Sequence, residues 1–300
     1  MRNMMDQSQS GTRTEGTMEK MDGKALSLLI ETEIKTNVQK FISMGNRSPK
    51  LVVLLIGDNP ASLTYVKNKE KACERVGITS DVIRMNSDVS TDDVIQVIKQ
   101  LNQDKSVDGI LVQLPIPKHL DVNLIIETLD PNKDVDGLHS INIAKLYANQ
   151  DGFVPCTPRG IMTLLKHYNV EISGKHAVVI GRSALVGRPV AQLLLNENAT
   201  VTVCHSKTQD LASLTQNADI VVVAIGKEKF LTSEHIHHAN AIIDVGINRV
   251  NDKLVGDVDF EALLDKVDYM TPVPGGVGPM TIVSLLENTM KSYEKSVKEN

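Results

Sequence analysis

Apolar and polar residues follow one another in blocks along the chain, and these blocks predict helices and strands in turn. Apolar positions three and four residues apart predict helices over 23–44, 60–76, 91–102, 122–129, 158–167, 189–196, 211–215 and 280–296. Short apolar, β-rich runs predict strands over 51–57, 81–85, 109–114, 177–180, 200–204, 219–225 and 241–245. Strands that alternate with helices in this way are typical of an α/β fold with largely parallel sheets.

The length and the punctuation of the chain predict two domains. A chain of 300 residues corresponds to about two domains, since domains usually have roughly 150 residues. The break is expected near 153–157, where Pro155 and Pro158 interrupt the pattern. Residues 1–17 are polar and lack the apolar centre of a signal peptide, so we interpret them as a disordered leader.

Composition narrows the class of protein. Lys and Arg number 32 against 37 Asp and Glu, and the net charge of −5 argues against a nucleic-acid-binding surface. The longest apolar run, 51–56, is far too short to cross a bilayer, so no membrane association is expected. The three cysteines stand far apart and outside any CxxC pair, which is typical of reduced thiols in a cytoplasmic protein.

A strand, a tight turn and a helix over 176–195 predict a dinucleotide site. Gly181 follows the strand, Ser183 takes the place of the usual second glycine, and Gly187 comes one residue late. The glycine pattern alone is weak. A helix N-terminus that follows a strand nevertheless presents backbone N–H groups to a pyrophosphate, and Pro189 favours helix entry. An ordinary strand–helix turn without a ligand remains the alternative.

The next strand indicates which dinucleotide this turn would hold. Cofactors without a 2′-phosphate usually pair with an acidic residue about 20 positions after the first glycine. The window 201–207 has no carboxylate and carries Ser206 and Lys207 instead, while Arg182 lies in the turn itself. Donors and cations suit a phosphate dianion, so NADP is favoured over NAD. For Lys207 itself, an ordinary solvent-facing lysine is the preferred interpretation.

The helix over 60–76 carries a lysine on its apolar side. At about 100° per residue, Lys69 falls among apolar positions, four residues after Tyr65, so the two side chains share a face. An ammonium drawn partly out of water tends toward a lower pKa and suits acid–base chemistry. Glu70 also falls on this side, and a lysine whose stem merely covers the edge of the core is an equally good interpretation.

Three further segments carry candidate chemistry. Gln113 is the only side-chain amide in the apolar run 109–117, at the end of a strand where α/β sheets bind ligands. Asp134 and Asp136 lie in a turn, where capping of backbone N–H groups is the simpler explanation. The loop 271–279, with three prolines and three glycines, has little side-chain bulk, so its backbone can approach a planar ligand.

Together these segments resemble the bifunctional methylenetetrahydrofolate dehydrogenase/cyclohydrolase family. The resemblance runs from about residue 20 to 292. The matching motifs are DGKAL, GDNPASLTYVKNKEKACERVGI, GILVQLPIP, NKDVDGLH, VPCTPRGIM, VVIGRSALVGRPVA, IDVGIN, GDVDF and TPVPGGVGPMT. PVPGGVGP and DVDG are the most telling, and the occurrence of all of them in this order makes the resemblance specific.

The resemblance implies an enzyme with two activities on one folate. It implies NADP-dependent oxidation of 5,10-methylenetetrahydrofolate to the methenyl form and hydrolysis of that product to 10-formyltetrahydrofolate. Lys69 would be the central catalytic group, Tyr65 would pack on the folate, Gln113 would tune Lys69, and Asp136 would bind the pterin edge. Loop residues Pro274 and Gly275 would line the folate slot. The implied NADP contacts are Gly181, Arg182, Ser183, Ser206 and Ile247.

The resemblance also implies an architecture. Residues 18–156 with 280–300 would form the folate-binding catalytic domain, and 157–279 a Rossmann-like NADP-binding domain, with a cleft between them. A homodimer formed through the NADP domain would be expected.

Three alternatives stand beside this interpretation. Tyr-x-x-x-Lys on a helix also marks short-chain dehydrogenases, but there the pair follows the glycine-rich turn, whereas Tyr65 and Lys69 precede Gly181 by over a hundred residues. A nucleotide-sensing protein of the same fold without activity is a second alternative. A metal enzyme built on the HIHH segment 235–238 is a third, and no matching carboxylate or cysteine neighbour supports it.

Overall fold

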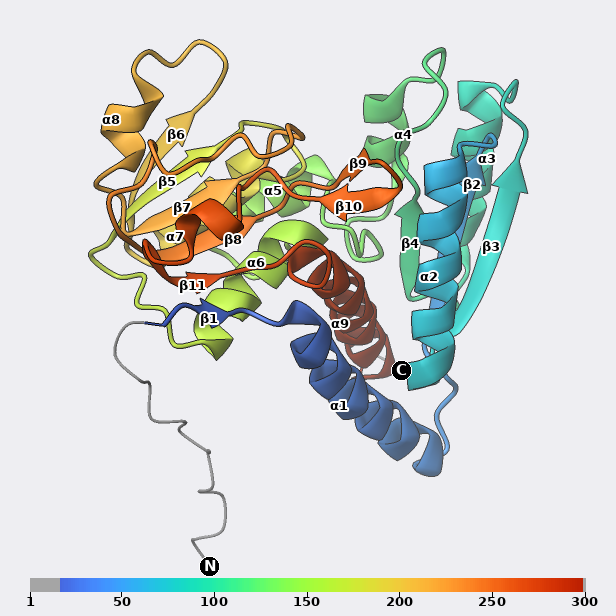
Figure 1. Cartoon of the computed structure of the whole chain (residues 1–300). Helices are drawn as coiled ribbons and strands as arrows, with labels where there is room; N and C mark the ends of the chain where they lie inside the picture. Colours follow the sequence, from blue (N-terminus) through green and yellow to red (C-terminus); the bar gives the residue numbers. More distant parts are fainter. Residues whose placement is uncertain (1–16, 299–300) are drawn as a thin grey trace, which may run out of the picture.

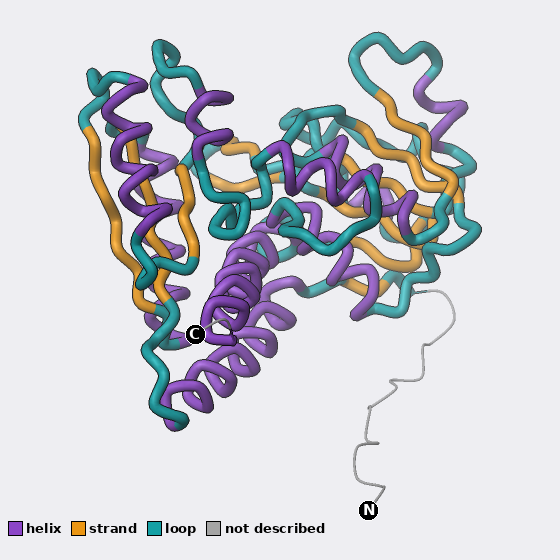
Figure 2. The backbone as a smooth tube through the Cα atoms, turned by 180° about the vertical axis from the view of Figure 1, so that it is seen from behind, coloured by secondary structure: helices purple, strands orange, loops and turns teal. Residues whose placement is uncertain are grey.

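The computed structural model describes residues 17–298, so all but the last residue of the expected leader 1–17 lies outside the described chain. Two lobes, each built on a parallel sheet, stand apart at one side of the molecule and are joined at the base by long helices (Figure 1). The view from behind shows the same two lobes with the joining helices between them (Figure 2). The predicted two-domain α/β fold is confirmed.

The first lobe contains a three-stranded parallel sheet of order β3-β2-β4. Its elements are β2 (Lys50–Ile56), α2 (Pro60–Val76), β3 (Thr79–Met85), α3 (Thr91–Gln103), β4 (Gly109–Val112) and α4 (Val122–Thr128). Successive side chains of β2 enter different cores: Leu51, Val53 and Leu55 pack with α2, whereas Val52, Leu54 and Ile56 pack with α3 and α4. Burial on both faces explains why β2 is apolar throughout.

The second lobe contains a six-stranded parallel sheet of order β1-β11-β8-β7-β5-β6. Its strands are β1 (Glu19–Lys20), β5 (His176–Ile180), β6 (Thr200–Cys204), β7 (Ile220–Val223), β8 (Ala239–Asp244) and β11 (Val267–Met270). Its helical elements are α7 (Gly187–Asn196), α8 (Leu211–Thr215) and η1 (Glu261–Leu263), and a hairpin of β9 (Asn248–Val250) and β10 (Lys253–Val255) projects from it. Strand β5 lies between β6 and β7, so the chain order reverses at its end, where such sheets bind ligands.

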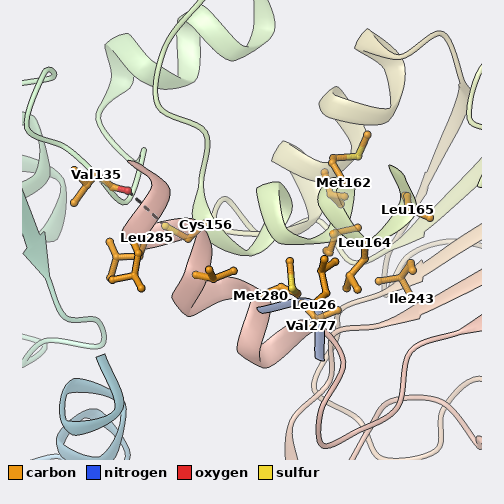
Figure 3. Packing of buried hydrophobic residues seen from close by; sticks show 14 of the residues in the cluster. Leu26, Val135, Cys156, Met162, Leu164, Leu165, Ile243, Val277, Met280 and Leu285 are labelled. Carbon is orange, nitrogen blue, oxygen red and sulfur yellow. Dashed lines mark hydrogen bonds between the residues drawn. The ribbon is translucent and has the colours of Figure 1, made fainter. Parts of the chain in front are cut away.

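Four helices connect the lobes: α1 (Gly23–Ser43), α5 (Ser140–Tyr147), α6 (Cys156–His167) and α9 (Val277–Lys298). The main apolar core runs without a break through α1, α6 and α9, from Leu111 in the first sheet to Ile243 in the second. Figure 3 shows its central part, where Met280 of α9 packs beside Leu164 of α6. The cleft is thus open on one side and closed below by a shared core.

The structure adds elements that the apolar pattern does not predict. Helix α5, strands β1, β9, β10 and β11, and the short η1 are absent from the expected elements. Most other expected elements agree to within about two residues at each end, whereas α9 begins three residues before its expected start. The missed strands are short and partly exposed, so they lack the continuous apolar run that marks a buried strand.

Candidate functional site

One large cavity lies between the lobes. It has a volume of about 1020 Å³ and is lined from the first lobe by α2 and the end of β4, and from the second by the end of β8 and the hairpin. The expected site residues that line it are Tyr65, Lys69, Gln113, Ile247, Pro274 and Gly275. Segments far apart in the sequence therefore meet here.

Helix α2 carries two of these residues. Its start is fixed by Asn59, whose side chain accepts hydrogen bonds from two backbone N–H groups, and its end by Gly77 in the left-handed conformation. The apolar face predicted for this helix is buried at Val66, Ala72, Cys73 and Val76. Tyr65 is 44% exposed and lies on the cavity wall instead of in the core.

Lys69 is held by Gln113. Its Nζ donates a 2.8 Å hydrogen bond to Oε1 of Gln113, which is 7% exposed at the end of β4. Nε2 of the same amide donates to the carbonyl of Leu114 at 2.7 Å. Because the second bond uses the NH₂ group, the amide must turn its oxygen toward the lysine. The ammonium is therefore placed at the cavity wall without a carboxylate partner in the hydrogen bonds of the described chain.

The two aspartates of the DVDG turn differ in their surroundings. Asp134 is fully buried and accepts hydrogen bonds from the backbone N–H groups of Leu138 and His139 and from Asn142, which is the capping role. Burial raises its pKa. Asp136 is half-buried and does not line the cavity. Asp134 therefore has the capping role, whereas Asp136 is the carboxylate that the resemblance implies for the site.

Cys156 connects Asp136 with Lys69. Burial is the main cause of its pKa lying well above the ordinary value; the Asp136 carboxylate raises it further and the Lys69 ammonium opposes the rise. The thiol donates to the carbonyl of Val135 at 3.5 Å (Figure 3). Both charged groups therefore lie close enough to the buried sulfur to influence it. No sequence pattern singles out Cys156, because an isolated cysteine carries no spacing signal.

The loop 271–279 forms the facing wall. Its Gly276 packs so closely on the start of α1 that a Cβ on Gly23 would lie 1.9 Å from the Gly276 carbonyl oxygen. The backbone N–H of Lys24 donates to the Gly275 carbonyl at 2.9 Å. The Val273–Pro274 peptide is cis. A bare backbone thus borders the cavity, as the glycine and proline content predicts.

The turn after β5 fits a dinucleotide. Gly181 has φ +124°, and a Cβ there would lie 2.4 Å from the Ala224 carbonyl oxygen; a Cβ on Gly187 would lie 2.2 Å from the Gly181 carbonyl oxygen. The hydroxyl of Ser183 accepts from the N–H groups of Val186 and Gly187 and shapes the start of α7. The close packing leaves a helix N-terminus at the end of the central strand, the geometry that binds a pyrophosphate.

The other expected NADP contacts lie around this turn or at the cavity. The N–H of Gly181 donates to the carbonyl of Cys204, which ties the turn to the end of β6, and Ser206 follows two residues later. Arg182, Ser183 and Ser206 are exposed and do not line the large cavity, whereas Ile247 does. The structure thus brings the expected folate-side residues except Asp136 to one cavity, and most NADP-side residues to a separate turn.

Two buried carboxylates, Asp244 and Asp257, shape the second-lobe wall, and no residue pattern in the sequence indicates a role for them. Asp244 is 4% exposed and accepts from the N–H groups of Gly246, Asp257 and Val258. Burial raises its pKa to about 6, although these N–H groups oppose the rise. Asp257 accepts in turn from the N–H groups of residues 225–227. The motifs IDVGIN and GDVDF, quoted only for the resemblance, therefore meet as one hydrogen-bonded unit.

Comparison with known proteins decides the family. Residues 21–136 match the model of the tetrahydrofolate dehydrogenase/cyclohydrolase catalytic domain, and residues 155–297 match that of the tetrahydrofolate dehydrogenase/cyclohydrolase NAD(P)-binding domain. The chain belongs to the tetrahydrofolate dehydrogenase/cyclohydrolase family. The two matches fall on the two sides of the cavity, so the family's catalytic domain carries Lys69 and its NAD(P)-binding domain carries the Gly181 turn.

Individual members of this family match over almost the whole chain. The Bifunctional protein FolD of Campylobacter hominis is 54% identical over 282 residues, 94% of this chain and 99% of the relative. The crystal structure of the FolD dehydrogenase/cyclohydrolase of Campylobacter jejuni superposes with a TM-score of 0.91 at 51% identity, covering 93% and 99% of the two chains. The Trypanosoma brucei enzyme, solved with NADP cofactor and inhibitor, has a TM-score of 0.90 at 37% identity, covering 94% and 99%.

The structure also bears on the alternatives. Tyr65 and Lys69 lie in the first lobe and the Gly181 turn in the second, unlike the single-domain arrangement of short-chain dehydrogenases. Among residues 17–298, no group of three or more His, Cys, Asp or Glu side chains is arranged to hold a metal ion. Within the same range, none of the helices combines the length and the apolar character that a membrane span requires.

Proposed function

We propose that this chain oxidises 5,10-methylenetetrahydrofolate with NADP and hydrolyses the resulting methenyl form to 10-formyltetrahydrofolate. The observation that carries this proposal is the hydrogen bond from Lys69 Nζ to Gln113 Oε1, 2.8 Å long, on the wall of the cavity. The loop with Pro274 and Gly275 lines the same cavity from the other side. Family membership and the names of the relatives supply the substrate class and both activities.

The first step requires positioning more than proton transfer. NADP, when bound, accepts a hydride from the methylene carbon, and the two adjacent nitrogens stabilise the cation that remains. The protein's task is to hold two flat rings face to face. Tyr65 and the Pro274–Gly275 backbone stand on opposite walls of the cavity and would pack on the folate. Asp136, half-buried in the DVDG turn, would accept from the pterin edge and set its orientation.

The second step requires proton transfer. Water adds to the methenyl carbon and loses a proton, which leaves a neutral hydroxyl adduct. The bond from that carbon to one ring nitrogen then breaks as that nitrogen gains a proton and the hydroxyl releases its own proton to solvent, which leaves the formyl C=O. Lys69 in its neutral form would take the first proton and, once charged, return one to the leaving nitrogen. Gln113 would act as a positioning residue, because its fixed amide oxygen holds Nζ at the cavity wall through this exchange.

The second lobe would hold NADP. The Gly181–Ser183 turn and the N-terminus of α7 would bind the pyrophosphate, and the exposed Arg182 and Ser206 would bind the 2′-phosphate. Ile247, half exposed on the cavity wall, would pack against the nicotinamide. The proposed division is therefore residues 18–156 with 280–300 for folate and 157–279 for NADP, with β1 extending the sheet of the second part.

An absorbance assay with 5,10-methylenetetrahydrofolate, run separately with NADP and NAD, tests the proposal. We expect NADPH to form without lasting build-up of the methenyl product, and NAD to be a poor substitute. Build-up of the methenyl form would contradict the hydrolytic half. No reduction of either nucleotide by folded protein would contradict the whole and favour the nucleotide-sensing alternative.

We also propose a cytoplasmic homodimer. The six-stranded sheet ends at β6, where Val203 is 39% exposed, and an exposed edge strand of this kind is a ready surface for a second copy. All three cysteines, Cys73, Cys156 and Cys204, are free and buried, which suits a reducing compartment. Light scattering should give twice the chain mass, and Val203→Lys should lower it toward the monomer; a monomeric wild type would contradict the dimer.

A further inference from the structure

The carboxylate of Asp244 connects the end of β8 with three segments of the second lobe. Asp244 is the last residue of β8 and lines the cavity, although only 4% of it is exposed. Oδ1 accepts hydrogen bonds from the N–H groups of Gly246 and Asp257 at 2.9 Å each, and Oδ2 accepts from Val258 at 3.0 Å. The N–H of Asp244 donates to the hydroxyl of Thr271 at 2.8 Å, where the proline- and glycine-rich loop begins. One residue therefore fixes the second-lobe backbone at three places.

Asp257 extends this network to the loop that follows β7. Its Oδ2 accepts from the N–H groups of Ile225 and Gly226 at 2.8 and 2.9 Å. Its Oδ1 accepts from the N–H of Lys227 at 2.8 Å and from Nδ2 of Asn248 at 3.0 Å. Asp257 is fully buried, and these four donors satisfy both of its oxygens. The loop and the hairpin residue Asn248 are therefore held by one buried side chain.

The loop after β7, residues 224–227, touches the turn that is proposed to bind the pyrophosphate. A Cβ on Gly181 would lie 2.4 Å from the carbonyl oxygen of Ala224 and 3.5 Å from Cγ2 of Ile225, so the two backbones are in direct contact. The N–H of Ala224 donates to the last carbonyl of β5 at 2.9 Å, and Asp257 holds the next three N–H groups. The loop therefore cannot shift without moving the cofactor turn.

The same two carboxylates hold the residue that is proposed to contact the nicotinamide. Ile247 is 50% exposed on the cavity wall, so packing alone does not fix its side chain. Its position depends on its neighbours in the chain. The N–H of Gly246 is bound by Asp244, and the side chain of Asn248 is bound by Asp257. The nicotinamide wall and the pyrophosphate turn thus depend on one hydrogen-bonded network.

The fit around both carboxylates is too close to admit a methyl group. A Cβ on Gly246 would lie 2.1 Å from Oδ1 of Asp257, and a Cβ on Gly256 would lie 1.7 Å from Oδ2 of Asp244. Closely packed interiors have little freedom to relax and transmit strain. A change at one carboxylate should therefore displace the segments that are bound to it.

We propose that Asp244 and Asp257 are positioning residues for hydride transfer, because together they hold Ile247 and the Gly181 turn in a fixed arrangement along the bound cofactor. This inference rests on the proposed function, which places the nicotinamide at Ile247 and the pyrophosphate at the Gly181 turn. Hydride transfer needs the two reacting rings in near contact, so a small displacement of the cofactor is costly. Hydrolysis of the methenyl form uses water and Lys69 of the first lobe and takes no hydride. The network therefore serves the first activity and not the second.

Kinetics of the two activities, measured separately on the full chain, tests the network. Asp257→Asn keeps the size of the side chain but turns an NH₂ group toward one pair of its N–H donors. We expect KM for NADP to rise about tenfold and kcat for oxidation of 5,10-methylenetetrahydrofolate to fall by about the same factor. Hydrolysis of added 5,10-methenyltetrahydrofolate should stay within about twofold of the wild type.

Asp108→Asn is the matched control. Asp108 is also buried and accepts from Arg47 and from the N–H of Lys50, but it precedes β4, at the opposite end of that strand from Gln113. Its loss leaves the arginine without its partner and should lower the melting temperature. The ratio of the two activities should remain that of the wild type.

Asn248→Ala is a milder variant that tests the same network if Asp257→Asn does not fold. Asn248 is half-buried, and the change removes the hydrogen bond of its side chain to Asp257 while the carboxylate keeps its three backbone donors. The rate of oxidation should fall about threefold, with hydrolysis unchanged.

Direct binding of the cofactor separates this inference from the proposed function. Calorimetric titration with NADPH needs no folate, and the affinity should fall about tenfold in Asp257→Asn but not in Asp108→Asn. A folded Asp257→Asn with wild-type NADPH affinity and oxidation, or variants that lower both activities equally, would overturn the positioning role alone. Absence of turnover by the wild type would overturn the proposed function, and the NADPH titration would still decide the network.

Discussion

At the scale of single residues, two buried amides each bind two partners. Gln113 accepts from Lys69 and donates to Leu114, and Asn288 of α9 donates to the carbonyls of Val135 and Val154. The sequence identifies Lys69 and Gln113 because each breaks an apolar pattern. It does not identify Asn288, since an asparagine in a helix of mixed polar and apolar residues interrupts no apolar pattern. Its partners also lie 134 and 153 positions away in the sequence.

Replacing the lysine should separate the two activities. Lys69→Met removes the only group proposed to exchange a proton with the attacking water, so we expect complete loss of hydrolysis. Hydride transfer should persist at a reduced rate, because it depends on positioning, and the methenyl form should accumulate. Its absorbance measures the result. A variant that still hydrolyses the methenyl substrate would contradict the role of Lys69.

Asp244 should make stability depend on pH. Its pKa is raised by burial from 3.8 to about 6 in the folded protein, so between these values the folded state binds the proton more tightly than the unfolded chain. Its contribution to the free energy of unfolding should fall by about 3 kcal/mol as pH rises from about 4 to about 6, and stay level above that.

Urea unfolding of the wild type and of Asp244→Asn across this pH range checks the prediction. Asparagine does not titrate, so the stability difference, wild type minus variant, should shrink by that amount as pH rises. Parallel curves for the two proteins would show that Asp244 keeps an ordinary pKa.

At the scale of elements, the sequence predicts the helices and strands that bury one face or both faces. Helix α2 agrees with its expected bounds because Asn59, Pro60 and Gly77 mark both ends and an apolar stripe marks the core face. Strand β1 is two residues of Glu and Lys, and only its pairing with β11 makes it a strand. The hairpin of β9 and β10 is polar and partly exposed, so no local pattern distinguishes it from a loop.

The same contrast applies to the site. The Gly181 turn and the PVPGGVGP loop are predictable because a backbone that packs closely against its neighbours needs residues without bulky side chains, and the glycines in the sequence show this. The end of the cavity between α1 and α2 is not predictable, since it exists only where the faces of two helices meet. Arg75 of α2 pairs there with Glu31 of α1, 44 positions earlier in the chain, and no local pattern indicates such a tertiary contact.

The strand–turn–helix unit should not tolerate a methyl group at Gly187. A Cβ there would lie 2.2 Å from the Gly181 carbonyl oxygen, so Gly187→Ala must displace the turn that would hold the pyrophosphate. We expect KM for NADP to rise by at least tenfold, an effect of about 1.4 kcal/mol, with KM for the folate little changed.

Gly45→Ala is the control for this variant. Gly45 has a positive φ and nothing lies within 4 Å of its added Cβ, so Gly45→Ala should lose about 1 kcal/mol of stability and leave both KM values unchanged. If Gly187→Ala bound NADP as the wild type does, the turn would not be the cofactor site.

At the scale of the whole molecule, one core serves two lobes. The helices α1, α6 and α9 join both sheets in a continuous apolar cluster, so neither lobe has a complete core by itself. The cleft can change its opening only by moving lobes around this shared base. The sequence suggests this through the expected return of the last helix to the first domain, but the extent of the shared packing follows only from the structure.

Unfolding should therefore be a single transition. Asn288→Ala leaves the carbonyls of Val135 and Val154 without their shared donor at the junction, and we expect a loss of about 2–4 kcal/mol. Calorimetry should show one peak that moves down as a whole, with both activities lost together on heating. Asn37→Ala, on the exposed side of α1, should leave the peak in place. Two separable peaks in the wild type would contradict the shared core.

The contact between Gly23 and Gly276 has a consequence for the order in which the molecule is made. The helix that begins at Gly23 starts against the loop from which α9 emerges, and Glu19 in β1 pairs with Tyr269 in β11. Glu19 and Gly23 are synthesised long before their partners Tyr269 and Gly276. Domains generally fold from the N-terminus as they emerge, but these two contacts cannot form until the later residues are present. A nascent chain that already contains Lys69 and Gln113 thus has no facing wall for a folate. The pocket is completed only after the loop 271–279 has been synthesised and has packed against the start of α1.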